Sequence, residues 1–241
     1  MTNRLCSYQC QRSVIKSINL ENLYRSANEN TFSIWSENAG IGAIKEGNYY
    51  DPLRLALAAG IQPPVTFDVS RLICELQQLT KDDPLADILP TQGFHFTFLP
   101  LTLPLYNENE PLPEKINELT NIWSEFDAIK IVIRDLHLVA LPSQLLLAGI
   151  PDSSAIAMHH SFCEKVLDSH WKNELLMRHT GSPLPAPFWH STILRYGADF
   201  LPAPVREFIF ERQTINFGDV DGELKLARVN YNWTKCYSLA D

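Results

Sequence analysis

The sequence has no long hydrophobic run. None of its apolar stretches approaches the roughly 20 residues that a membrane-spanning helix requires. Residues 1–16 also lack the apolar segment of a secretory signal peptide. We therefore expect a soluble, cytoplasmic protein that does not bind a membrane.

Cysteine is scarce and irregularly placed. The five cysteines are odd in number and follow no regular spacing, which argues against a disulfide scaffold. Cys6 and Cys10 are four residues apart, but no second Cys/His pair stands at zinc-finger spacing. We therefore expect a protein of a reducing compartment with no metal and no other cofactor.

Basic residues are in the minority. The chain has 20 Lys and Arg against 28 Asp and Glu, which gives a formal net charge of −8. Phosphate neutralisation by basic side chains dominates the binding of long nucleic acids, so this balance argues against such a partner. A small nucleotide or a short RNA end, held by a few local groups, remains compatible with it. We expect a substrate of that size and a monomeric protein.

The sequence does contain one pattern twice. Two apolar, aromatic segments of strand length each carry His-x-Thr-apolar, with His95 and Thr97 in the first and His190 and Thr192 in the second. Side chains alternate between the two faces of a strand, so each His shares a face with its Thr. Two such strands side by side would bring two imidazoles and two hydroxyls into one cleft.

Periodicity and turn residues predict the surrounding elements. Helices are expected at residues 17–27, 51–59, 68–79, 114–126, 153–177 and 202–212. Strands are expected at residues 65–67, 93–99, 129–133, 136–141, 144–150, 188–194, 214–220 and 223–233. The dipeptide Asp221-Gly222, between the last two strands, is a typical hairpin turn.

The order of these elements repeats. Each motif strand is followed by a helix and then by two strands. This repetition predicts an α+β fold with two lobes related by pseudo-two-fold symmetry. Each lobe would contribute one motif strand to a shared cleft.

A third match to the pattern, at His159 to Phe162, falls in a segment of helical periodicity. Residues two apart on a helix lie about 200° apart around its axis, so His159 and Ser161 would point in different directions. We therefore reject this match as a site. It also shows that a single copy of the pattern is weak evidence.

The doubled pattern suits attack on a phosphodiester. One imidazole can act as the base that deprotonates the nucleophile, and the other as the acid that protonates the leaving oxygen. The two threonine hydroxyls can stabilise the charge on the phosphate oxygens. Which of His95 and His190 is the acid is left open. The alternative for these four residues is a pair of structural His-Thr strands.

At these residues the chain resembles the 2H phosphoesterases, whose hallmark is two His-x-Thr/Ser-apolar motifs on inner strands. It is similar in particular to bacterial RNA 2',3'-cyclic phosphodiesterases, also called 2'-5' RNA ligases, because Phe188 and Arg195 flank the second motif as they do in that group. The resemblance implies a bilobal α+β fold of two antiparallel sheets, with a central cleft and helices outside. It covers residues 61–241 and leaves residues 1–60 as an N-terminal extension or lid packed on the core.

The resemblance implies a metal-independent phosphodiesterase acting on a 2',3'-cyclic phosphate or a related nucleotide or RNA-end phosphodiester. His95, Thr97, His190 and Thr192 would be the catalytic residues. The alternatives are a nucleotide-binding module without turnover, or an enzyme of the same fold that cleaves cyclic or 2'-5' oligonucleotides. Pro100 and Pro104 depart from the Phe-Leu-Gly that often follows the first motif in relatives, which leaves the substrate open.

Two residues after the second motif are candidates for substrate binding. Arg195 could face the phosphate or lie on a strand surface, and Tyr196 could stack on a base or pack in the core. Four further aromatic side chains could form a base-stacking wall, although ordinary packing is the simpler interpretation for each: Tyr49, Tyr50, Tyr231 and Trp233.

Overall fold

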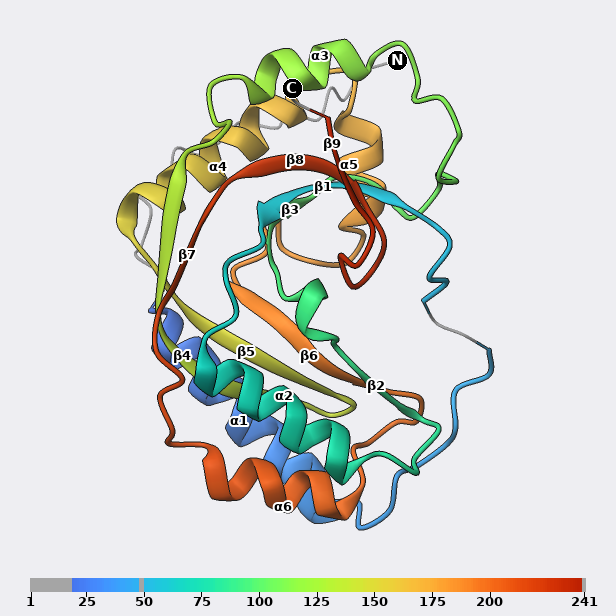
Figure 1. The fold of residues 1–241 in the computed structure, drawn as a ribbon, viewed down its shortest axis with the longest axis vertical. Coiled ribbons are helices and arrows are strands. Elements are labelled where there is room, and N and C mark those ends of the chain that lie inside the picture. Colours follow the sequence, from blue (N-terminus) through green and yellow to red (C-terminus); the bar gives the residue numbers. More distant parts are fainter. Residues whose placement is uncertain (1–18, 48–49, 240–241) are drawn as a thin grey trace, which may run out of the picture.

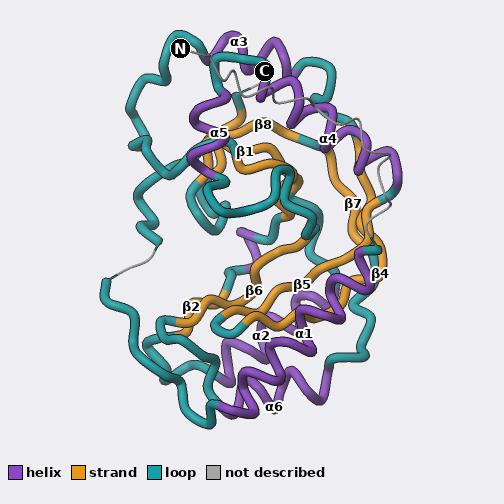
Figure 2. The backbone as a smooth tube through the Cα atoms, turned by 180° about the vertical axis from the view of Figure 1, so that it is seen from behind, coloured by secondary structure: helices purple, strands orange, loops and turns teal. Residues whose placement is uncertain are grey.

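Two antiparallel sheets form the centre of the computed structural model, which describes residues 19–47 and 50–239 (Figures 1 and 2). The strands are β1 (Ala56–Ile61), β2 (Ala86–Ile88), β3 (Phe96–Pro100), β4 (Lys130–Leu141), β5 (Gln144–Pro151), β6 (His190–Tyr196), β7 (Val220–Glu223), β8 (Lys225–Val229) and β9 (Cys236–Ser238). The helices are α1 (Leu20–Glu37), α2 (Phe67–Leu79), α3 (Ile116–Trp123), α4 (Ser153–Leu167), α5 (Lys172–Arg178) and α6 (Ala203–Arg212), with a 3₁₀ turn, η1 (Thr91–Gly93).

The four-stranded sheet has the order β3-β1-β8-β9, and the five-stranded sheet has the order β2-β6-β5-β4-β7. Helices α1, α2 and α6 lie together on the side of the five-stranded sheet, and α3, α4 and α5 lie at the opposite end of the molecule, beyond the four-stranded sheet (Figure 1). The predicted α+β class with two antiparallel sheets is confirmed. Within the described ranges, no helix is long and apolar enough to cross a bilayer.

The hairpin predicted around Asp221-Gly222 is wrong. Both residues lie inside β7, where they pair with β4. The chain passes at Leu224 from β7 in one sheet to β8 in the other, so the two strands do not pair with each other. The turn signal was outweighed by the pairing with β4, and Gly222 serves close packing instead, since a Cβ there would lie 3.1 Å from Ile61.

The helix predicted at 51–59 and the strand predicted at 65–67 are also wrong. Residues 56–61 form β1, the strand between β3 and β8, and Thr66 is the N-cap of α2, with its hydroxyl accepting from the Val69 amide. The apolar run from Leu55 to Ile61 is almost wholly buried. A short apolar run of this kind fits a central strand as well as a helix, and periodicity alone does not separate them.

Helix α1 is longer than the predicted helix at 17–27 and is docked through side-chain hydrogen bonds. Beyond the part of β4 that pairs with β7, Asn28 donates to the Leu138 carbonyl (3.2 Å) and accepts from the Ala140 amide (2.6 Å). Thr31 Oγ1 donates to the Ala140 carbonyl at 2.8 Å. Helix α1 therefore covers backbone groups that would otherwise form an open sheet edge. The domain boundary predicted at residue 60 stays a prediction, and β1 runs across it.

The predicted long helix at 153–177 is divided into α4 and α5, with Trp171 buried at the junction. His159 lies on α4 and is 5% exposed, with its ring 5.0 Å from the rings of both Phe98 and Trp189. The third pattern match is thus on a helix, as predicted, and its histidine is a core residue. Cys6 and Cys10 lie outside the described residues.

Candidate functional site

The two predicted motif strands belong to different sheets and lie against one another. β3 is the end strand of the four-stranded sheet, and β6 lies between β2 and β5 in the other. His95 directly precedes β3, and His190 is the first residue of β6. The Phe98 and Trp189 rings form an edge-to-face contact, with their centroids 5.7 Å apart.

Strand β6 bulges immediately after its motif. Leu146 of β5 pairs with Thr192 and Leu145 pairs with Leu194, so Ile193 is an extra residue on β6. Strict alternation would place Arg195 on the face opposite to His190 and Thr192. The bulge reverses the phase and turns Arg195 onto their face.

Strand β3 bulges at the equivalent position. Gly60 of β1 pairs with Thr97 and Ala59 pairs with Leu99, which makes Phe98 the extra residue. The last residue of each motif, the apolar fourth position of His-x-Thr-apolar, is therefore the inserted residue of the bulge. Phe98 and Ile193 are 3% and 0% exposed, so both inserted side chains are held in the core.

The His95 ring is fixed on two sides. Its Nδ1 lies 2.6 Å from the Gly93 carbonyl, and its plane stacks on Trp233 with ring centroids 5.0 Å apart and an angle of 12°. Because a carbonyl can only accept, Nδ1 carries the proton and Nε2 is left as the acceptor in the neutral ring. Burial lowers the pKa of His95 to about 3, and the charges of Arg195 and His190 act in the same direction.

The His190 ring is neutral for a similar reason. Burial lowers the pKa of His190 to about 4, with the Phe188 carbonyl opposing this shift and Arg195 adding to it. Its Nδ1 is buried and has no hydrogen-bond partner among the described residues. The Phe188 ring lies edge-on to the imidazole at 6.2 Å. The charge of Arg195 adds to the lowering of both histidine pKa values, so His95, His190 and Arg195 lie close enough for their charges to interact.

Thr192 takes the place that strand alternation predicts. No bulge separates His190 from Thr192, so they share a face, while Ser191 points the other way and is fully buried. Thr97 is the second residue of β3 and is half-buried, and Thr192 is 8% exposed. Thr97 and Thr192 therefore lie on the two strands that contact each other, and each is two residues after its motif histidine.

The loop between β8 and β9 covers this region. Trp233, at φ 55°, adopts a left-handed backbone conformation that costs a non-glycine residue free energy. The loop lies so close to Gly93 that an added Cβ would be 2.2 Å from the Asn232 carbonyl oxygen. Glycine before His95 thus allows this loop to approach, and the loop places Trp233 on His95 and Tyr231 on Arg195.

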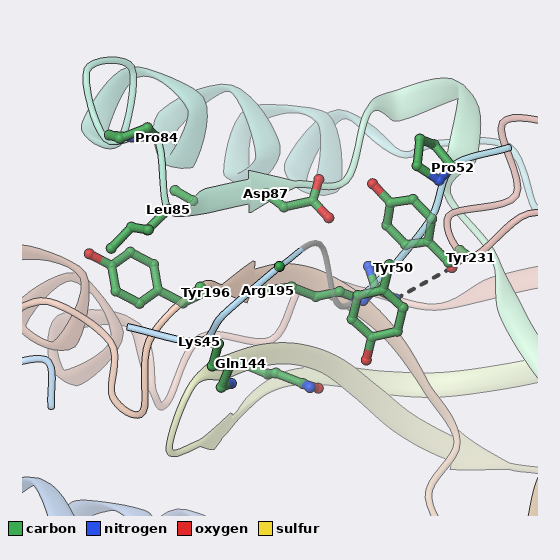
Figure 3. A pocket seen from close by; sticks show the side chains of 13 residues that line it. Lys45, Tyr50, Pro52, Pro84, Leu85, Asp87, Gln144, Arg195, Tyr196 and Tyr231 are labelled. Atoms are coloured by element: carbon green, nitrogen blue, oxygen red, sulfur yellow. Dashed lines mark hydrogen bonds between the residues drawn. The ribbon is translucent and has the colours of Figure 1, made fainter. Parts of the chain in front are cut away.

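A cavity of about 840 Å³ opens next to Arg195 (Figure 3). Its lining residues come from β2, β6, the first residue of β5 and the segments around residues 45, 50, 84 and 231, and do not include His95 or His190. They are Lys45, Gly47, Tyr50, Pro52, Pro84, Leu85, Ala86, Asp87, Gln144, Arg195, Tyr196, Gly197 and Tyr231. The cavity is therefore a neighbour of the histidine pair, and Arg195 belongs to both.

Arg195 lies on the cavity wall, and its predicted role in substrate binding stays a prediction. Its guanidinium lies over the rings of Tyr50 and Tyr231, 5.0 and 5.2 Å from their centroids, and its Nη2 donates to the Tyr231 carbonyl at 3.5 Å. The two tyrosine rings stack at 5.2 Å and 18°. Tyr50 and Tyr231 thus form an aromatic wall of the cavity, whereas Trp233 stacks on His95 and Tyr49 lies outside the described residues.

Tyr196 also lines the cavity, but it is 5% exposed and its hydroxyl donates to Asp83 at 2.8 Å. Burial, with Asp83 adding to it, raises the pKa of Tyr196 to about 12. These contacts indicate a wall residue whose polar atom is already engaged. A role of Tyr196 in substrate binding stays a prediction.

Asp87 and Gln144 line the cavity and were not predicted from the sequence. Asp87 lies in β2, opposite Arg195 of β6. The polar, proline-containing composition of residues 81–91 is typical of a loop, and this is what the sequence predicts. The signal that could have revealed them is an extended apolar run from Leu85 to Leu89 interrupted by a single aspartate.

No protein-family model matches the chain, and no curated protein matches it. Among solved structures, the chain is similar to the crystal structure of TT0787 of Thermus thermophilus, with a TM-score of 0.48 and 16% identity. That match covers 76% of this chain and 97% of the other. At this level of likeness, the function has to be argued from the site itself. No group of three or more potential metal-ligating side chains is present within the described residues.

Three histidines with lowered pKa values, two buried and one half-buried, predict an acid-sensitive fold. The folded-state pKa values of His95, His159 and His190 are about 3, 3 and 4, below the ordinary 6.5. The unfolded chain therefore binds more protons between these values, and stability falls as the pH decreases through this range. Each histidine should remove up to about 2 kcal/mol of unfolding free energy between pH 7 and pH 5.

Urea unfolding at the two pH values measures this loss. The substitution His159→Gln, outside the candidate site, should give a smaller difference in unfolding free energy between pH 7 and pH 5 than the unsubstituted protein. Equal stability of the unsubstituted protein at both pH values would contradict the burial of neutral imidazoles.

Proposed function

We propose that this protein is a phosphodiesterase of the 2H phosphoesterase type. It would hydrolyse a 2',3'-cyclic phosphate, or a related phosphodiester at the end of a nucleotide or short RNA, with His95 and His190 as acid and base. The observation that carries the proposal is the meeting of two His-x-Thr strands from different sheets, with both imidazoles and Arg195 in electrostatic reach. The matching bulges after the two motifs support a pseudo-two-fold relation between the lobes.

In the proposed reaction, one neutral imidazole removes a proton from water and the water oxygen attacks phosphorus. The P–O bond to the leaving hydroxyl breaks, and the other histidine, in its protonated form, donates a proton to that oxygen. Thr97 and Thr192 donate hydrogen bonds to the remaining phosphate oxygens, where the charge increases in the transition state. The assignment of acid and base between His95 and His190 is open.

The low histidine pKa values fit this scheme when substrate charge is included. Burial keeps both rings neutral at pH 7 in the free protein, as the pKa values of about 3 and 4 indicate. A phosphate anion placed between them favours the protonated form of whichever imidazole it contacts and raises its pKa. One base and one acid are then present only when substrate is bound.

The test is an assay of the four nucleoside 2',3'-cyclic phosphates, 2'-5' dinucleotides and cyclic dinucleotides, each with and without EDTA. We expect turnover of at least one cyclic phosphate or 2'-5' linkage, at a rate unchanged by EDTA. Loss of all activity on chelation would contradict the proposed metal-independent mechanism. Absence of turnover on the entire panel would count against the phosphodiesterase itself.

A further inference from the structure

The cavity beside Arg195 contains one acidic side chain, Asp87, in a lining that otherwise combines basic, amide, aromatic and small apolar residues. Asp87 and Arg195 lie opposite each other in the β2–β6 register, so both side chains leave the sheet on the same face. Figure 3 shows the Asp87 carboxylate pointing away from Tyr196 and toward the ring of Tyr231. Lys45, the other basic lining residue, has its Nζ bound to Ser143 Oγ at 2.9 Å.

The Asp87 carboxylate retains hydrogen-bonding capacity for a ligand. Its neighbour is the Tyr231 hydroxyl: burial, together with the charge of Asp87 and hydrogen bonding to it, raises the pKa of Tyr231 to about 12. A carboxylate offers about four lone-pair sites, so one phenolic hydroxyl occupies a minority of them. Asp87 is therefore a strong acceptor at one edge of the cavity.

The part of the lining next to Asp87 is an aromatic and cationic wall. Tyr50 and Tyr231 stack on each other, and the Arg195 guanidinium lies over both rings. Aromatic rings and guanidinium planes are the surfaces on which unpaired nucleobases stack. The wall adjoins the histidine pair through Arg195, whose charge adds to the effect of burial in lowering the pKa of both histidines.

We propose that this cavity is a subsite for a guanine-type nucleobase, with the ring on the Tyr50–Tyr231–Arg195 wall and its two adjacent N–H donors on Asp87. This inference rests on the proposed function for the placement of the phosphate, near His95 and His190. The Watson–Crick edge of guanine presents N1–H and N2–H₂ side by side, which matches the two oxygens of one carboxylate.

The other bases fit this acceptor less well. Uracil presents one N–H between two carbonyl oxygens, which a carboxylate repels. Adenine and cytosine each present an amino group next to an unprotonated ring nitrogen, which supplies one donor and one repelling lone pair. Because a site built for hydrogen bonding disfavours ligands that leave its polar groups unpaired, the half-buried Asp87 should make the subsite selective.

The test is calorimetric binding of the four nucleoside 3'-monophosphates, which need no turnover. We expect the guanosine nucleotide to bind at least ~10-fold more tightly than the other three, the smallest difference that a charged hydrogen-bonding pair usually gives. Asp87→Asn should lower affinity for the guanosine nucleotide by a similar factor and leave the others within about 3-fold. Asp82→Asn, on a side chain that is 89% exposed, is the matched control and should change nothing.

Equal affinities of the unsubstituted protein for all four nucleotides would overturn the subsite, and this measurement does not depend on how Asp87→Asn folds. The same guanosine preference in the well-folded variant would also overturn it. Hydrolysis of the four 2',3'-cyclic phosphates separates the two proposals. Guanosine-selective binding without turnover supports the subsite and rejects the phosphodiesterase. Turnover without base preference in binding or rate supports the phosphodiesterase and rejects the subsite.

Discussion

His95→Asn and His190→Asn should each lower kcat on the hydrolysed cyclic phosphate by about 10²–10⁴-fold, the usual contribution of a positioned acid or base. Asparagine keeps a polar side chain of moderate size but does not titrate near neutral pH. KM should change little, because Thr97, Thr192 and Arg195 would still hold the phosphate. Steady-state kinetics at pH 7 measures the effect.

The control for these variants is His170→Asn. His170 is an exposed histidine, with its side chain 85% accessible, beside Glu118. Its substitution should leave kcat within about 2-fold, since surface ion pairs of this kind contribute little. A near-normal kcat for His95→Asn or His190→Asn would remove that residue from acid–base catalysis. Circular dichroism of each variant distinguishes a catalytic loss from unfolding.

The motif strands and their neighbouring elements were largely predictable because local patterns determine them. The pairing of β4 with β5, the helices near residues 116–123 and 203–212 and the His-Thr spacing all follow from apolar periodicity and turn residues. The position of Arg195 was not predictable in the same way. A bulge depends on the partner strand, so the extra residue Ile193 becomes visible only once β5 is paired with β6.

The cavity illustrates a second limit of local patterns. Tyr50, Asp87, Arg195 and Tyr231 come from four separate segments and meet only in the folded chain. Each has an ordinary explanation when considered alone: a loop aromatic, a loop acid, a strand surface residue and a packing aromatic. The aromatic wall was foreseen as one possibility for Tyr50 and Tyr231, but its acidic counterpart Asp87 was not.

Arg206→Met should lower the unfolding free energy by about 3 kcal/mol, because it leaves buried carbonyl groups without a charged donor. Arg206 is 7% exposed and donates to four backbone carbonyls. Nε reaches Leu201 at 2.6 Å, and Nη1 and Nη2 reach Asn38 and Gly40 at 2.6 Å each. Nη1 also reaches Trp35 at 3.2 Å, and the guanidinium lies 5.4 Å from the centroid of that residue's ring.

The loss of stability in Arg206→Met would also affect the candidate site, because α1 contacts the residue that precedes the second motif strand. Tyr24 of that helix donates its hydroxyl to the Gly149 carbonyl at 2.9 Å and accepts from the Trp189 amide at 3.1 Å, one residue before His190. Tyr24 therefore joins α1 to the residue before the second motif, and Arg206 joins the C-terminal end of α1 to α6. If residues 1–60 behaved as a detachable lid, loosening α1 would change substrate binding and leave the stability of the core intact.

Urea unfolding of Arg206→Met and Arg206→Lys distinguishes the two behaviours. Lysine keeps the charge but lacks the planar fork that serves several carbonyls at once, so it should recover only part of the loss. Arg71→Met is the matched control, since the Arg71 side chain is 56% exposed and its ion pairs, with Asp68 and Glu75, lie on its own helix. This substitution should cost no more than about 0.5 kcal/mol of unfolding free energy. An Arg206→Met protein as stable as the control would mean that α1 is not anchored through this guanidinium. A single cooperative unfolding transition, with the expected loss of unfolding free energy, would make α1 part of the core that holds His190.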